Sequence, residues 1–229
     1  MTTSALASLR IWGTVTSPFV RRVRIVALEL GVEHQLVDTN GDDGQRELRS
    51  RSPIWKVPIA EVSGARELPD ATLVFDSHAI TELLLQRAGA DAPLRAPASW
   101  QHDAAVAIDE RNAVAVIDAA LESLINVFYV GRDGLDVEGS AYLIKQRERA
   151  AAALAWLDAR IDARGRPCAT PRGADADRLG LPEIALVTAL GWMRFRDTYP
   201  IERHPRLARC LAELDERPSF AATRPFAAR

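Results

Sequence analysis

Three hydroxyl-bearing side chains precede a proline near the start of the chain, within the stretch TVTSPFVRRVRI at residues 14–25. They are Thr14, Thr16 and Ser17, and Pro18 is followed by a run that is apolar and basic together. A serine before such a run is typical of a helix N-cap, whose oxygen accepts a hydrogen bond from the first turn. A helix N-terminus also carries a partial positive charge that stabilises anions, so the same hydroxyl is well placed to do chemistry. These residues alone leave both interpretations open.

The elements that must position this stretch alternate between strand and helix patterns as far as residue 89. In chain order the sequence predicts a strand at 8–13, a helix from Ser17 to Leu30 closed by Gly31, a strand at 33–39, a polar loop at 40–53 with room for a short irregular helix, strands at 56–62 and 72–75, and a helix at 76–89. A helix between the first two strands makes them parallel with a right-handed crossover, whereas the last two can form an antiparallel hairpin. This order predicts a thioredoxin-like α/β domain.

Strand patterns stop after a linker at 90–99 that is rich in alanine and proline. The helices expected beyond it are a long one that Ser99 caps and that runs from Trp100 through Ile117, one from about Ser140 to Arg164, one at 181–196 with Pro182 in its first turn, and one from His204 to Arg217 that Pro218 ends. The sequence therefore predicts a thioredoxin-like domain at 1–89, the linker, and an all-helical domain at 100–229.

The bulk composition is ordinary for a globular protein, with 48% hydrophobic and 26% charged residues and a net charge of −2. A chain so close to neutral has no strong field to attract nucleic acid or an anionic membrane, so neither is expected as a partner. No apolar run in the sequence approaches the length of a membrane span, and the N-terminal residues lack the pattern of a signal peptide.

The cysteines and histidines favour neither a disulfide framework nor a metal site. Cys168 and Cys210 are the only cysteines, and free thiols in a reducing cytoplasm are the simpler explanation. The four histidines are scattered and show no metal-ligand spacing, so no metal is expected. We therefore expect a cytoplasmic protein.

Four sequence features follow one another in a fixed order: TSPFVRRVRI after the first strand, WKVP opening the third strand, FDSHAI between the fourth strand and its helix, and HPRLARCLAELDERPSFAATRP near the end. Together they resemble the glutathione transferase superfamily. Each motif alone is weak, but the ordered set is specific and extends over nearly the whole chain. The opening stretch is most similar to the serine-type transferases, the tau-like and related bacterial forms. One departure is GLPE at 180–183, where the family usually has a Ser or Thr cap followed three residues later by Asp.

The resemblance implies a glutathione site with named residues. Pro58 would follow a cis peptide bond, so that the backbone of Val57 pairs with the cysteinyl backbone of glutathione, and Lys56 would meet the glycyl carboxylate. Ser77 would hold the γ-glutamyl carboxylate, and Asp76, where the family more often has glutamate, would face the α-amino group. Each position also has a plain structural explanation: a strand-start proline, a solvated lysine and a helix N-cap.

The chemistry implied is activation of the glutathione thiol. A thiol with a pKa near 8.5 is mostly protonated at neutral pH, and lowering that pKa by about two units requires roughly 2.7 kcal/mol. A charge-assisted hydrogen bond supplies roughly 1.5–3 kcal/mol and a helix N-terminus up to about 1–2 kcal/mol. Ser17 offers both. Thr16 is the alternative donor, whereas the segment has no tyrosine and residues 1–167 contain no cysteine.

The expected function is a glutathione transferase, with possible peroxidase activity, acting on a small electrophilic or hydrophobic co-substrate. The acceptor is expected between the domains, under Phe19 and facing the long helix, where Arg111 and Asn112 are either pocket residues or part of a solvated stripe. The alternatives are a non-catalytic glutathione or ligand binder of the same fold, and a glutathione-dependent isomerase, dehalogenase or lyase. The resemblance also implies a homodimer.

Overall fold

The computed structural model describes residues 8–64, 68–89, 91–168 and 177–226. The chain divides into two compact units. The first unit holds the described residues of Met1–Pro97, Asp177–Gly180 and Pro218–Arg229, and the second unit holds those of Ala98–Ala176 and Leu181–Arg217.

A four-stranded mixed sheet with the order β2-β1-β3-β4 forms the centre of the first unit. The strands are β1 (Ser8–Gly13), β2 (His34–Asp38), β3 (Ile59–Ser63) and β4 (Thr72–Phe75). The pair β1–β2 is parallel, whereas β3 runs antiparallel to both β1 and β4. The predicted parallel first pair, the antiparallel last pair and the thioredoxin-like fold are confirmed.

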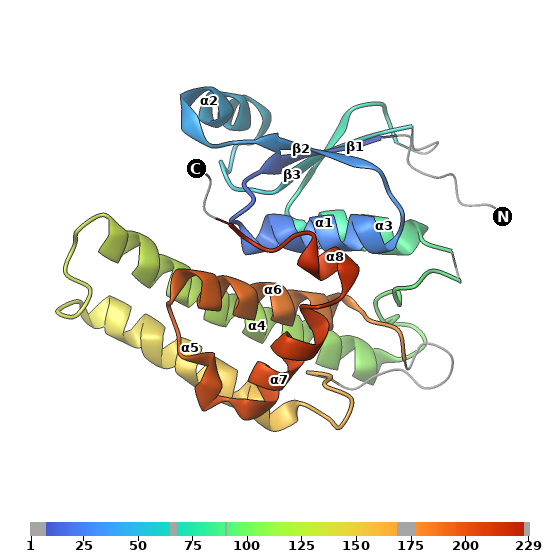
Figure 1. Cartoon of the computed structure of the whole chain (residues 1–229). Helices are drawn as coiled ribbons and strands as arrows, with labels where there is room; N and C mark the ends of the chain where they lie inside the picture. Colours follow the sequence, from blue (N-terminus) through green and yellow to red (C-terminus); the bar gives the residue numbers. More distant parts are fainter. Residues whose placement is uncertain (1–7, 65–67, 90, 169–176, 227–229) are drawn as a thin grey trace. The chain divides into compact units, whose positions relative to one another are not determined.

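Helices cover both faces of this sheet (Figure 1). The helices α1 (Pro18–Glu29) and α3 (Ser77–Arg87) lie on one face, and α2 (Gly41–Arg51) lies on the other. The alternation of strand side chains follows this division, because Leu9 and Ile11 point to one face and Arg10 and Trp12 to the other. Leu9 and Ile11 are buried, as is the apolar stripe of α1.

Helix α2 is longer and more regular than the loop the sequence predicted there. It has 11 residues, of which only Leu48 is buried. An apolar periodicity therefore could not reveal it. Its ends do carry a helix signal, because Asp42 and Asp43 lie in the first turn and Arg49 and Arg51 in the last, which complements the helix dipole.

The second unit is all-helical, as predicted. Its elements are α4 (Ala104–Arg132), α5 (Ala141–Arg160), α6 (Leu181–Arg196), the 3-10 helix η2 (Ile201–Arg203) and α7 (Pro205–Leu214). The core forms where α4 packs against α5 and α6. The predicted bounds were wrong at several ends: α4 begins later than Trp100, α5 ends before Arg164, and α7 ends before Arg217.

The cap of α4 is Asp103 rather than Ser99. The Asp103 carboxylate accepts from the Val106 N–H at 3.3 Å, whereas the Ser99 hydroxyl accepts from the Gln101 N–H at 3.2 Å. Ser99 therefore closes a turn before the helix, a role that the same residue type fills as readily as capping.

Pro218 does not merely end a helix, as predicted, but begins α8 (Pro218–Ala221), which lies against α1 in the first unit. The guanidinium of Arg21 donates to the Phe220 carbonyl at 2.9 Å and to the Thr223 hydroxyl at 3.4 Å. The described residues from Pro218 onward thus pack with the sheet unit, whereas the sequence assigned them to the helical domain.

Helix α4 is, by length and composition alone, long and apolar enough to cross a membrane, and it is the one such helix in the described part of the chain. The sequence reading that no run approaches that length was therefore wrong for α4. Its buried stripe, which includes Ile117, Leu121 and Leu124, packs within the helical unit. Core helices of globular domains pass the same test of length and composition.

Candidate functional site

The hydroxyl of Ser17 caps α1, as predicted. Ser17 has extended backbone angles, φ −76° and ψ 124°, and its Oγ accepts a hydrogen bond from the Val20 N–H at 3.3 Å. Pro18 occupies the first turn, where its missing N–H costs nothing. Ser17 is half-buried, so its hydroxyl is in reach of a ligand while it caps the helix. A hydroxyl that accepts in this way still has its own proton to donate.

The neighbouring hydroxyl, that of Thr16, has a different partner. Thr16 Oγ1 lies 3.2 Å from Thr14 Oγ1, and either atom can be the donor. When Thr16 donates in this pair, its one proton is engaged. When Thr14 donates instead, the Thr16 proton stays available, so this contact by itself does not decide between the hydroxyls of Thr16 and Ser17.

The close approach of strand and helix at Gly13 places Ser17 against the end of β1. A Cβ added at Gly13 would lie 2.3 Å from Val20 Cγ2, a distance that no real side chain tolerates. The glycine therefore lets the first turn of α1 pack directly on the strand that precedes it.

The peptide bond between Val57 and Pro58 is cis, which confirms the geometry expected there. Pro58 is buried and Val57 half-buried, whereas Lys56 is exposed. The side chain of Val57 packs against a core cluster of Trp12, Leu48 and Ile59. The position of Val57 thus depends on both the sheet and α2.

Asp76 and Ser77 begin α3, as predicted. The Asp76 carboxylate accepts from the His78 N–H at 2.8 Å and is exposed. A carboxylate has more acceptor sites than this one bond uses, so Asp76 can still meet an amine. Ser77 is only 2% exposed, and its hydroxyl accepts from Arg22 Nη1 at 3.4 Å.

Arg22 is the residue near this site that sequence reasoning missed. It is fully buried in α1, and besides Ser77 its guanidinium lies over the ring of the half-buried Phe19 at 5.4 Å. A permanent positive charge thus lies directly behind the first turn of α3. The sequence of α1 gave one weak sign that an arginine could be buried there, because three arginines interrupt its apolar run.

The register of the sheet brings the three segments together. Ile59 pairs with Trp12 on β1 and with Phe75 on β4. The end of β1, the start of β3 and the end of β4 therefore lie at the same end of the sheet. Ser17, Val57 and Asp76 follow or precede these three points within five residues of the chain.

Arg111 and Asn112 lie on α4 in the helical unit. Arg111 donates to the carbonyls of Ala98 at 3.3 Å and Ala107 at 3.0 Å, and its guanidinium lies 4.4 Å from the Trp100 ring centre. It thus holds the chain that leads into the unit, while Asn112 is exposed.

The thiols offer no nucleophile. Cys210 is 1% exposed, its Sγ donates to the Gly165 carbonyl at 3.2 Å, and burial, with Glu213 as the next cause, raises its pKa to about 11. Cys168 is also buried and free of any disulfide. Within the described ranges, no three His, Cys, Asp or Glu side chains are grouped so as to hold a metal ion.

We expect Cys210 to resist alkylation in the folded protein at pH 8, because the thiolate is the reactive form and almost none is present. Iodoacetamide labelling followed by peptide mass spectrometry measures this, with the urea-unfolded chain as the control in which Cys210 is labelled. Labelling of Cys210 in the folded chain at the rate of a free thiol would contradict the buried position.

Comparisons with known proteins find matches in both halves of the chain. Residues 12–92 match the family model described as the glutathione S-transferase N-terminal domain, and residues 103–217 match that of the C-terminal domain. The chain is 26% identical over 224 residues to the uncharacterized GST-like protein YibF of Escherichia coli, covering 95% of this chain and 98% of YibF.

Solved structures show the same fold. A glutathione S-transferase of Methylobacterium radiotolerans, in complex with glutathione sulfonate, superimposes with a TM-score of 0.76 at 25% identity, covering 97% of both chains. A glutathione S-transferase of Methylobacillus flagellatus with glutathione bound has a TM-score of 0.74 at 24% identity, covering 95% of this chain and 100% of that one.

Proposed function

This chain belongs to the glutathione S-transferase family, and from that premise we propose that it binds glutathione and activates the glutathione thiol through the hydroxyl of Ser17. The observation that carries the proposal is the juxtaposition of the N-terminus of α1, the cis bond before β3 and the N-terminus of α3 at one end of the sheet. One extended glutathione molecule would place its thiol at the N-terminus of α1, its cysteinyl backbone beside Val57 and its γ-glutamyl carboxylate at the N-terminus of α3.

The thiolate would lie at the N-terminus of α1. The hydroxyl of Ser17 accepts from the Val20 N–H and donates its proton to the sulfur, while the helix terminus adds its partial positive charge. Together these contributions reach the roughly 2.7 kcal/mol that lowers a thiol pKa by about two units. The thiolate then attacks an electrophilic carbon or a peroxide, which requires no nucleophile from the protein.

The two ends of glutathione would extend from this point. The backbone of Val57 pairs with the cysteinyl residue in the manner of an added strand, and the exposed Lys56 meets the glycyl carboxylate. The γ-glutamyl carboxylate lies at the N-terminus of α3, where the buried Arg22 behind Ser77 adds positive charge, and Asp76 faces the amine. The position of the Ser17 hydroxyl at the cap of α1 supports the proposal that the chain is of the serine type.

We further propose that the chain acts as a homodimer in the cytoplasm, as transferases of this family commonly do. Light scattering at micromolar concentration measures the mass directly. A mass of one chain at concentrations that support full activity would overturn the dimer.

The proposed function is tested by calorimetric titration of the protein with glutathione, followed by turnover assays with an aryl halide and an organic hydroperoxide. We expect saturable binding at one site per chain and turnover of at least one acceptor. Binding without turnover of any acceptor would instead favour the ligand-binding alternative, and no binding at all would overturn both.

A further inference from the structure

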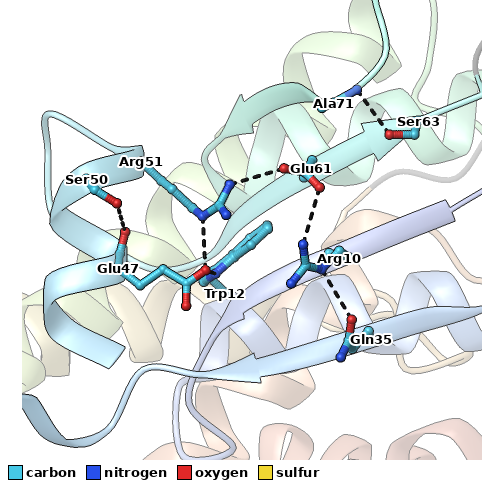
Figure 2. Close-up of polar contacts among 9 residues, drawn as sticks. All are labelled: Arg10, Trp12, Gln35, Glu47, Ser50, Arg51, Glu61, Ser63 and Ala71. Carbon is cyan, nitrogen blue, oxygen red and sulfur yellow. Dashed lines mark hydrogen bonds and ion pairs between the residues drawn. The ribbon is translucent and has the colours of Figure 1, made fainter. Parts of the chain in front are cut away.

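A polar network surrounds Trp12 on the face of the sheet that α2 covers (Figure 2). The Trp12 indole N–H donates to Glu47 Oε1 at 2.9 Å, and Trp12 itself is fully buried. The guanidinium of Arg51 lies 4.2 Å from the ring centre and that of Arg10 lies 4.9 Å from it. A buried indole N–H needs an acceptor, so Glu47 meets a requirement of the core.

The same network joins α2 to β3. Arg51 donates to Glu47 Oε1 at 3.2 Å and to Glu61 Oε2 at 3.1 Å, and Arg10 lies 3.6 Å from Glu61 Oε1. The side chains of Arg51, Glu47 and Glu61 are partly covered, so solvent screens this network less than an exposed pair. The hydrogen bond from Trp12 is the main cause that holds the pKa of Glu47 below its usual value. Glu47 is therefore ionised at neutral pH.

Besides the polar network, helix α2 is held by one buried side chain and by contacts with the segments that flank it. Leu48 is its only buried residue, Gln45 Nε2 donates to the Thr39 carbonyl at 2.7 Å, and the Arg49 guanidinium lies 5.1 Å from the Trp55 ring centre. Leu48 packs with Trp12 and Ile59, and Val57 packs against the same cluster. The chain leaves α2 at Arg51 and reaches Val57 six residues later. Trp12 and α2 together thus support the segment that leads to the cis bond.

We propose that Glu47 is a positioning residue for glutathione: by holding α2 on Trp12 it fixes the segment from Ser52 to Pro58, which presents Lys56 and the backbone of Val57. This inference rests on the proposed function, because it concerns the contacts assigned there to the glycyl and cysteinyl parts of the tripeptide. Glu47 acts through the segment and is not itself a contact of the ligand.

The test compares Glu47→Ala and Glu47→Gln with Asp43→Asn as the matched control. Asp43 is also an acidic residue of α2, but its side chain and that of its ion-pair partner Arg46 are both exposed. Glutamine retains an oxygen that can accept from Trp12 and loses the charge that pairs with Arg51, so we expect its effects to lie between those of alanine and the wild type. Asp43→Asn removes the same charge from the same helix without touching Trp12.

The first readout is hydrogen exchange of the amides at Ile54–Val57 in the ligand-free protein. We expect about tenfold faster exchange in Glu47→Ala, the equivalent of one lost charge-assisted hydrogen bond, and wild-type exchange in Asp43→Asn. Amides of α1 and α3 serve as internal controls, because a general loss of stability would accelerate them too. Unchanged exchange at Ile54–Val57, or an equal increase in α1, overturns the proposal.

The second readout is the dependence of turnover on glutathione concentration. Loss of a ground-state contact raises KM and leaves kcat, so we expect KM for glutathione to rise about tenfold in Glu47→Ala with kcat within about twofold. Faster exchange at Ile54–Val57 with an unchanged KM for glutathione would overturn the proposal that Glu47 positions this segment for glutathione binding. Absence of glutathione binding in the wild-type protein would refute the proposed function, and hydrogen exchange would still decide whether Glu47 holds the segment.

Discussion

Replacing Ser17 by alanine is expected to lower turnover with glutathione at least tenfold while the affinity for glutathione is nearly kept. The hydroxyl would contact only the sulfur, whereas the remaining contacts with the tripeptide would come from Lys56, Val57 and the N-terminus of α3. A group that stabilises the thiolate rather than the bound tripeptide changes kcat more than KM. Steady-state kinetics with glutathione as the varied substrate separates the two parameters.

The pH dependence of this variant gives a second measurement. Without the hydroxyl, the pKa of the bound thiol rises toward about 8.5, so the rising limb of the kcat profile moves to higher pH by about one to two units. Loss of the cap also lowers stability by about 1 kcal/mol, which thermal unfolding detects.

Thr16→Val is the control, because Thr16 bonds to Thr14 and does not cap the helix. We expect its turnover to remain within a few-fold of the wild type. Unchanged turnover in Ser17→Ala, and again in the variant that lacks both hydroxyls, would refute the mechanism.

Replacing Glu183 by glutamine is expected to cause the largest loss of stability. Glu183 lies in the first turn of α6 with its side chain fully buried, and its Oε1 lies 3.4 Å from Arg166 Nη1, whose side chain is 7% exposed. Removing one charge of a buried ion pair is strongly destabilising, at a cost of about 3–5 kcal/mol. For a chain of this size, a loss of about 3 kcal/mol corresponds to a fall in Tm of about 6–12 °C.

The matched control is Glu213→Gln. Glu213 pairs with Arg209 at 3.7 Å on α7, and both side chains are more than half exposed, at 59% and 53%. Such a pair contributes at most about 1 kcal/mol, so Tm should change little. Differential scanning calorimetry compares the two variants, and equal Tm values for them would show that the Arg166–Glu183 pair is not a stabilising contact.

Local patterns identified the parts of the site that depend on neighbouring residues. The cap at Ser17, the first-turn position of Pro18 and the start of α3 at Asp76 were all predicted, because capping depends on the residue and the next few amides. The parallel first pair and the antiparallel last pair of strands followed from the order of strands and helices along the chain. The family resemblance, carried by short motifs in order, supplied the cis bond before Pro58.

Contacts between distant residues were beyond sequence reasoning. Gly180 looked like a weak cap, but a Cβ there would lie 2.5 Å from Arg95 Cζ, and Arg95 is only 2% exposed. A serine at this position would therefore require the buried guanidinium of Arg95 to shift. Glu183, which looked like a substitute in the same motif, has its partner in Arg166, on the turn after α5.

The sequence by itself determined the order of elements, the thioredoxin-like and helical units and the hydroxyl at the start of α1, since these depend on residues close in the chain. Only the tertiary structure decided that Arg22 lies behind Ser77, that Glu47 supports Trp12 and that α8 returns to α1. Each of these contacts joins residues that are more than 30 positions apart. Periodicity and propensity report the environment of one segment, whereas the partner of a buried charge is set by how segments pack.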